Sequence, residues 1–152
     1  MKFIITIAKL HDIEEINNML TNLIQDERKN YDDNINENYK VKNFYEQFTN
    51  NKDACILIAK YNNETLGYVY GFIQNNGNIF NKNIAQIDAL FVKEQYRGNG
   101  ISKKLIQEFT KWAKDKGCSY VELSVCNNNL KAINLYKNEG FKTEKLILKK
   151  KV

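Results

Sequence analysis

Two glycines separated by one residue, Gly98-Asn99-Gly100, stand where a strand-like stretch passes into a helix-like one. Residues 84 to 92 are rich in apolar and β-favouring types, which predicts a strand covered on both faces. From Ile101 onward, apolar residues recur at the spacing of an amphipathic helix. The first turn of a helix presents unpaired N–H groups and partial positive charge, and glycines let an anion approach closely, so this loop predicts an anion site. Three cations surround it: Arg97, Lys103 and Lys104.

Two other kinds of phosphate-binding loop fit this sequence less well. A Walker A loop needs four residues between its glycines and then Gly-Lys-Ser/Thr, whereas this loop has one residue between them. A Rossmann fingerprint needs a third small residue where Lys103 stands, and an acid at the end of the next strand. Glu122 is near the expected distance, but it lies inside that strand. A glycine loop that only turns the chain remains the alternative.

The glycine loop and a segment downstream of it resemble motifs of the GNAT acetyltransferase family. Gln95-x-x-Gly98-x-Gly100 resembles the pyrophosphate-binding loop of that family. Asn129-x-x-Ala132-x-x-Leu135-Tyr136-x-x-x-Gly140-Phe141 resembles the closing segment of the family and follows at the expected distance. The close resemblance covers about residues 84 to 148, with a weaker match near the start of the chain.

The resemblance implies that acetyl-CoA is a co-substrate and that no metal takes part. Backbone groups of one strand would hold the pantetheine arm and the acetyl oxygen: Leu90, Phe91 and Val92. The loop and the first helical turn would hold the pyrophosphate: Gln95, Tyr96, Arg97, Gly98, Asn99, Gly100, Ile101, Ser102 and Lys103. Asn129 matches a position that contacts the cofactor arm. Tyr136 matches the position usually assigned as general acid for the departing thiolate.

The implied reaction is direct attack of a primary amine on the thioester while both substrates are bound. A primary ammonium has a pKa of about 10 and must lose a proton before it attacks. The candidate bases are Asp88, Glu122 and ordered water. Asp88 lies nearest the expected acetyl position, although it could instead be a structural acid held by backbone donors. Tyr136 could be a core aromatic, and because phenol is a weaker acid than a thiol by about 2 kcal/mol, we expect it to donate a hydrogen bond to the sulfur.

The acceptor side is predicted from an acidic segment, residues 26 to 37, which has a local charge of −3 from five acids and two bases. By resemblance this segment flanks the acceptor groove, so it favours a small cationic amine such as a polyamine or an aminoglycoside. A peptide or protein amine is an alternative acceptor, and a non-catalytic acyl-CoA-binding module is an alternative function. A solvated loop would also explain the acids.

The order of predicted elements is β-α-α-β-β-β-α-β-α-β, a mixed α/β fold. We expect the GNAT arrangement: a central mixed sheet with an antiparallel N-terminal meander and one βαβ crossover, flanked by about four helices. The strand ending near Val92 and the strand from Tyr120 to Val125 should splay apart and admit the pantetheine.

Local patterns place several boundaries of this fold. Asp12-x-x-Glu15 predicts a capping box, and residues 40 to 50 predict a second short helix. Asn62-Asn63-Glu64 predicts a hairpin connection. Gly117 predicts the end of the helix that follows the glycine loop. Residues 141 to 149 predict a strand that closes the sheet.

The 152 residues predict a single domain, 1 to 152. No apolar stretch approaches the ~18 residues of a membrane span, and the apolar start is too short for a signal peptide, so we expect no membrane association. Three cysteines without CxxC spacing and one histidine argue against disulfides and zinc, and for the cytoplasm.

The net charge of +5 suits a polyanionic cofactor. Because the lysines are scattered, we expect no nucleic acid as partner; a homodimer is allowed.

Overall fold

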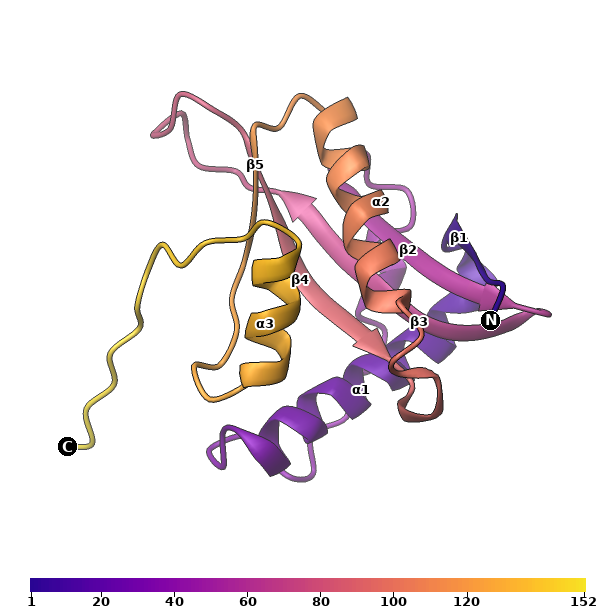
Figure 1. The fold of residues 1–152 in the computed structure, drawn as a ribbon, viewed down its shortest axis with the longest axis horizontal. Coiled ribbons are helices and arrows are strands. Elements are labelled where there is room, and N and C mark those ends of the chain that lie inside the picture. The colour runs from indigo at the N-terminus through magenta and orange to yellow at the C-terminus, as the bar shows by residue number, and fades with distance from the viewer.

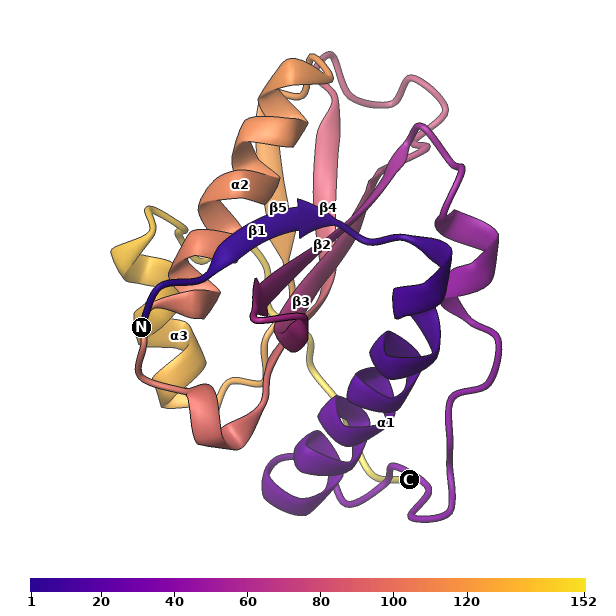
Figure 2. The same ribbon diagram turned by 90° about the vertical axis from the view of Figure 1, so that its right-hand side faces the viewer.

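A sheet of five strands forms the middle layer of the computed structural model, which describes residues 1–152 (Figures 1 and 2). The strands lie in sequence order: β1 (Ile4–Ile7), β2 (Ala54–Tyr61), β3 (Glu64–Ile73), β4 (Ile84–Val92) and β5 (Tyr120–Leu123). The first four pair antiparallel, and β5 pairs parallel with β4. The predicted mixed sheet with an antiparallel meander and one crossover is confirmed.

Helices cover both faces of the sheet. On one face lies α1 (Ile13–Asn30), and on the other lie α2 (Ile101–Asp115) and α3 (Leu130–Asn138), as Figure 2 shows. The expected second helix over residues 40 to 50 is wrong, because only the 3-10 turn Tyr45–Phe48 forms there. Asn43 has a φ of 50°, which interrupts a helix immediately before that turn. The fold therefore has three α-helices rather than about four.

Two apolar layers hold the helices on the sheet. The layer under α2 contains α2 residues and alternate side chains of the strands: Leu57, Ala59, Leu66, Val69, Ala85, Ile87, Val92, Leu105, Phe109 and Ala113. The layer under α1 contains α1 residues, the strand side chains that point to this face, and Tyr45 of the 3-10 turn: Ile13, Ile16, Met19, Tyr45, Ile56, Ile58, Tyr68, Tyr70, Ala89 and Phe91. Each helix therefore buries one stripe, as its periodicity predicts. None of the helices is both long and apolar enough to span a bilayer.

The start of α1 is held by ion pairs instead of the predicted capping box. Asp12 Oδ2 accepts the backbone N–H of Lys9 at 2.8 Å, and Asp12 Oδ1 pairs with Lys60 Nζ on β2 at 2.6 Å. Glu15 Oε1 pairs with Lys93 Nζ just beyond β4 at 2.8 Å. The capping prediction is wrong because both acids are taken by lysines distant in sequence. These pairs fix α1 to β2 and to the end of β4.

Two predicted turns match the structure, whereas the end of β5 and the segment after α3 do not. The hairpin turn is confirmed, with φ of 46° at Asn62 and 67° at Asn63, and Gly117 follows the end of α2 with a φ of 79°. β5 ends at Leu123 rather than at Val125. The predicted closing strand over residues 141 to 149 is wrong, because that segment has no regular secondary structure and no strand beside it.

Candidate active site

β4 continues beyond the end of its pairing with β5, and we call the unpaired side of β4 after Ile87 the opening. Their parallel pairing ends at Ile87 and Leu123, while β4 continues to Val92. The N–H of Lys93 donates to Leu66 O on the β3 side at 2.9 Å. Because main-chain groups alternate sides along a strand, those of Leu90 and Val92 point away from β3 and into the opening. The two strands stop pairing at the point where the expected splay would begin.

A β-bulge in β4 sets the direction of Asp88. Tyr70 lies opposite Ala89, but the next residue, Gly71, lies opposite Ile87, so Asp88 has no partner on β3. Ile87 packs under α2, whereas Ala89 packs under α1. The inserted residue therefore reverses the alternation of side chains, as bulges do.

The bulge brings the Asp88 carboxyl beside buried tyrosines on the α1 side of the sheet. Burial raises the pKa values of Tyr68 and Tyr70, and the nearby charge of Asp88 raises them further. Tyr68 Oη and Tyr45 Oη lie 3.0 Å apart. Partial burial also raises the pKa of Asp88 above its ordinary value, although the residue keeps an exposed side. Such a carboxylate is a stronger base than a fully hydrated one.

The glycine loop presents a run of free backbone donors. The N–H groups from Gly98 to Lys103 donate to no other backbone group, and the first helical bond after the loop is Lys104 N–H to Gly100 O at 3.1 Å. Gly98 and Gly100 have φ of 82° and 75°, and no atom lies within 4 Å of a Cβ placed on either. The loop is therefore an open cradle of N–H groups at a helix N-terminus, the arrangement that binds anions.

The charged side chains around the loop are held by acids. Arg97 donates from Nε to Val92 O at 2.9 Å and from Nη2 to Asp26 Oδ2 on α1 at 3.1 Å. Lys104 pairs with Glu108 at 2.8 Å, and Lys103 lies 3.8 Å from Glu139. Exposed pairs of this kind are worth about 1 kcal/mol or less, so an incoming anion can compete for the cations.

Other loop residues hold its shape. Tyr96 Oη donates to Glu64 Oε2 at 2.7 Å, so the hydroxyl points toward the β2–β3 hairpin. Asn99 Nδ2 donates to Tyr96 O at 3.1 Å. Ile101, the first residue of α2, is buried, whereas Gln95 is exposed and Ser102 is half-buried.

Asn129 precedes the first residue of α3, and Tyr136 lies in the last turn of that helix. Asn129 Oδ1 accepts the N–H of Ala132 at 3.2 Å and so caps the helix. The Tyr136 ring packs edge-on against Phe141, with centroids 5.8 Å apart. Burial, followed by the charge of Glu27, raises the pKa of Tyr136 to about 12. Tyr136 therefore feels the charge of Glu27 although α3 and α1 cover opposite faces of the sheet (Figure 2).

Glu27 is a candidate site residue that the sequence analysis did not single out. It lies half-buried on α1, where burial and the neighbouring Asp32 raise its pKa. Burial and then the charges of Glu27 and Asp32 raise the pKa of the Cys126 thiol. The helical spacing could have indicated this, because Glu27 stands four positions after Leu23 and continues the buried stripe of α1.

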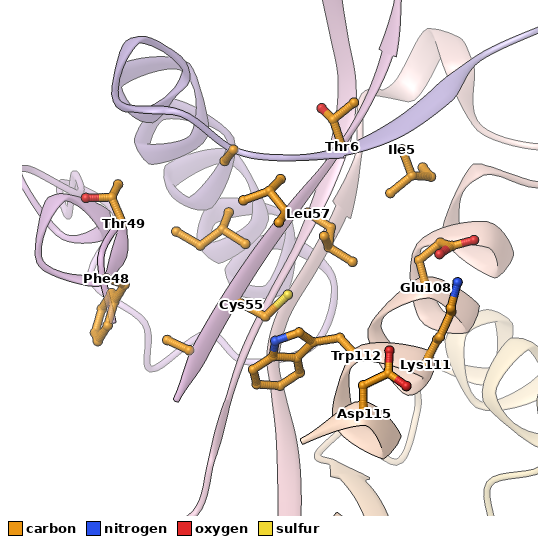
Figure 3. Close-up of a pocket in the computed structure, with 14 residues that line it drawn as sticks. Ile5, Thr6, Phe48, Thr49, Cys55, Leu57, Glu108, Lys111, Trp112 and Asp115 are labelled. Atoms are coloured by element: carbon orange, nitrogen blue, oxygen red, sulfur yellow. The ribbon is translucent and has the colours of Figure 1, made fainter. Parts of the chain in front are cut away.

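A separate hollow of about 330 Å³ lies at the far edge of the sheet (Figure 3). It is lined by β1, the start of β2 and the end of α2, including Cys55, Trp112 and Asp115. None of the predicted site residues lines it. Burial raises the pKa of the Cys55 thiol to about 12, so this cysteine is not a nucleophile at neutral pH. The hollow is therefore separate from the candidate active site.

The Acetyltransferase (GNAT) family matches residues 17–141, which include the opening, the cradle and α3. The chain belongs to this family. Thialysine N-epsilon-acetyltransferase of Sus scrofa is 44% identical over 54 residues, which are 36% of this chain and 32% of that protein. The chain thus matches only about a third of such curated relatives.

Two solved structures show the same GNAT fold. A mutant protein from Bacillus halodurans has a TM-score of 0.85 at 20% identity and covers 98% of this chain and 99% of its own. AAC(6′)-Iy in complex with the bisubstrate analogue CoA-S-monomethyl-acetylneamine has a TM-score of 0.75 at 18% identity and covers 100% of this chain and 99% of its own.

The raised pKa of Asp88 predicts a pH-dependent cost to stability. A carboxyl whose pKa is higher in the folded protein holds its proton more tightly there, so the free energy of unfolding falls as pH rises through that pKa. Asp88→Asn removes this cost. We expect the variant to melt at a higher temperature than the wild type at neutral pH, with the gain vanishing toward acid pH. A melting series across pH tests this, with Asp33→Asn on an exposed loop as control; a gain independent of pH would contradict it.

Proposed function

We propose that the protein is a cytoplasmic N-acetyltransferase that moves the acetyl group of acetyl-CoA to a small cationic primary amine. The observation that carries the proposal is the cradle of free N–H groups at the start of α2, which follows directly on the unpaired end of β4. Two further features support it: Leu90 and Val92 direct main-chain groups away from β3, and the charge of Glu27 on α1 acts on Tyr136 on α3.

The residues present fit coenzyme A. The N–H groups from Gly98 to Lys103 would hold the pyrophosphate, and Arg97 and Lys103 would add charge when released from their acids. The main-chain groups of Leu90 and the N–H of Val92, whose carbonyl accepts from Arg97, would hold the amides of the pantetheine arm in the manner of an added strand. When bound, acetyl-CoA supplies the activated acyl group. The chain orients the thioester and excludes water, and free donors beside the opening can stabilise a developing oxyanion.

Tyr136 would act as a hydrogen-bond donor to the leaving sulfur. With a pKa of about 12 the phenol stays protonated at neutral pH. Full transfer of its proton to a thiolate of pKa about 8.5 would be about 5 kcal/mol uphill. The hydroxyl therefore stabilises the thiolate by a hydrogen bond, and the proton comes from solvent.

Asp88 would take the proton of the attacking amine, directly or through water. Its carboxyl lies on the strand that borders the opening, and its raised pKa makes it a better proton acceptor. Glu122 is a weaker candidate, because it accepts a hydrogen bond from Gln74 Nε2 at 3.2 Å within the paired part of β5.

The acceptor class follows from the acids at the α1 side of the opening. Asp26 and Glu37 are paired with arginines, but Glu27 and Asp32 bring negative charge toward Tyr136 and Cys126. A cationic amine suits such a place better than an anionic one. The names of the relatives agree: one acetylates thialysine, and a neighbour was solved with an acetylneamine analogue.

Gly100→Asp tests the cofactor site. The carboxylate would stand against the pyrophosphate, and the affinity for coenzyme A should fall at least about tenfold by calorimetry, since like charges and a blocked approach both oppose binding. Gly77→Asp is the control, because Gly77 also has a positive φ and open space but lies in the loop before β4. Equal affinity in both variants would remove the cradle from the site.

Tyr136→Phe tests the role of the hydroxyl. The ring and its packing on Phe141 remain, so the melting temperature should change little. The kcat for thiol release should fall by about one to three decades, because the donor to the sulfur is lost. Tyr39→Phe, at an exposed position, is the control. Reduced stability with unchanged kcat would make Tyr136 a core aromatic only.

Glu27→Gln tests the acceptor class in a thiol-release assay with polyamines, aminoglycosides, lysine analogues and anionic amino acids. We expect turnover of cationic amines, with the acceptor KM raised in the variant and the KM of acetyl-CoA unchanged. The difference should shrink with salt, which screens charges over about 8 Å at physiological ionic strength. Glu37→Gln, in an exposed pair with Arg28, is the control. An equal acceptor KM at low salt would remove Glu27 from the acceptor site, and no turnover with any amine would favour a binding module.

A further inference from the structure

Glu64 joins two residues of the turn that leads from β4 into the cradle. Its Oε2 accepts the Tyr96 hydroxyl at 2.7 Å, and its Oε1 accepts from Lys93 Nζ at 3.4 Å. Lys93 stands just before the 3-10 turn Glu94–Tyr96, and Tyr96 ends that turn. The hydrogen bond from Tyr96, and then that from Lys93, lower the pKa of Glu64, so the carboxylate is charged at neutral pH. One carboxylate thus holds both ends of the turn.

This carboxylate stands on a well-fixed part of the sheet. Glu64 is the first residue of β3, and the next two residues, Thr65 and Leu66, are buried. β3 pairs with β2 on one side and with β4 on the other. The N–H of Lys93 extends the second pairing by donating to Leu66 O at 2.9 Å. Glu64 therefore holds the turn against a strand that is hydrogen-bonded on both sides.

The cradle depends on this turn for its position. Asn99 Nδ2 donates to Tyr96 O at 3.1 Å and to Arg97 O at 3.4 Å, which links the cradle to the end of the turn. Open space lies over Gly98 and Gly100, so packing does not hold the cradle from outside. The turn on one side and the start of α2 on the other therefore set the direction of the free N–H groups.

A bound anion would not compete for the contact between Tyr96 and Glu64. Arg97 and Lys103 are held by ion pairs with acids, and an anion in the cradle would draw both cations away. The Tyr96 hydroxyl instead points to the β2–β3 hairpin, where its partner is a carboxylate that an anion does not attract. This contact can hold the turn both before and after an anion binds.

We infer that Glu64 is a positioning residue for the cofactor: by holding Tyr96 and Lys93 it keeps the donors of the cradle in place before coenzyme A arrives. A site that is already ordered loses less free energy on binding. The inference rests on the proposed function of the cradle. The charge of Glu64 alone would act in the opposite direction, because a carboxylate near the cradle repels a polyanion. Removing Glu64 therefore weakens binding only if its positioning role outweighs its charge.

Calorimetry with coenzyme A and NMR relaxation on the ligand-free protein test the inference. In Glu64→Ala the dissociation constant for coenzyme A should rise about three- to tenfold, the effect of losing one or two hydrogen bonds. The backbone order parameters of residues 98–103 should fall in the same variant. Glu64→Gln keeps an oxygen that can accept the Tyr96 hydroxyl, so it should recover part of the affinity. Glu94→Ala removes an exposed acid of the same turn and is the matched control.

Steady-state kinetics separate positioning from general damage. In Glu64→Ala the KM of acetyl-CoA should rise, while kcat, the acceptor KM and the melting temperature should change little. Tyr96→Phe should raise the KM of acetyl-CoA as well, because it removes the hydroxyl that Glu64 holds. The double variant should lose less than the sum of the two single effects, since both residues act through one contact.

The outcomes distinguish this inference from the proposed function. Equal or tighter binding of coenzyme A in Glu64→Ala, with a wild type that binds it, would overturn the inference and leave the proposed function standing. An equal loss in Glu64→Ala and Glu94→Ala would also overturn it, because the effect would not be specific to Glu64. A wild type that binds no coenzyme A would overturn the proposed function, and the role of Glu64 with it.

Discussion

The structure depends on where the hydrogen bonds between β4 and β5 stop. Backbone N–H and C=O groups of a sheet interior are paired, so a strand that continues beyond its neighbour leaves donors and acceptors that another molecule can use. After Ile87 the β5 side of β4 is open, and Leu90 and Val92 direct their main-chain groups there. α2 begins after the open end of β4, α3 follows the end of β5, and the bulge at Asp88 lies where the pairing stops.

The two sides of the gap differ in the source of their charge. On the α2 side the positive potential comes mainly from aligned peptide N–H groups, which need no side-chain rearrangement to face an anion. On the α1 side the negative potential comes from ionisable groups, Glu27 and Asp32, and burial followed by the charge of Asp32 raises the pKa of Glu27. One ligand would therefore meet a fixed dipole field and the other a titratable one.

Features set by short stretches of chain were predictable from the sequence. The Asn62-Asn63 turn, the end of α2 at Gly117 and the strand, loop and helix around Gly98 each depend on a few neighbouring residues. Distant contacts caused the errors. Asp12 pairs with Lys60 instead of capping α1. The side to which Asp88 points depends on its register with Tyr70. Glu27 is a candidate because its charge acts on Tyr136, a contact between α1 and α3 that the sequence alone does not reveal.

The predicted strand over residues 141 to 149 failed for a different reason. Its composition is that of a strand, but a strand also needs a neighbour, and the chain offers none along the path that follows Gly140. The sequence of this segment therefore indicates its strand propensity correctly, but it does not show whether a partner strand is available.

The Arg97–Asp26 pair joins the loop that precedes α2 to the last turns of α1. A ligand that draws Arg97 away leaves Asp26 unneutralised near Glu27, so the field that attracts cations to α1 increases. Thermodynamic linkage makes this effect reciprocal: a cation bound near Asp26 must favour release of Arg97 toward an anion by the same factor. One surface ion pair would thus make two oppositely charged ligands bind cooperatively, with no change in the fold.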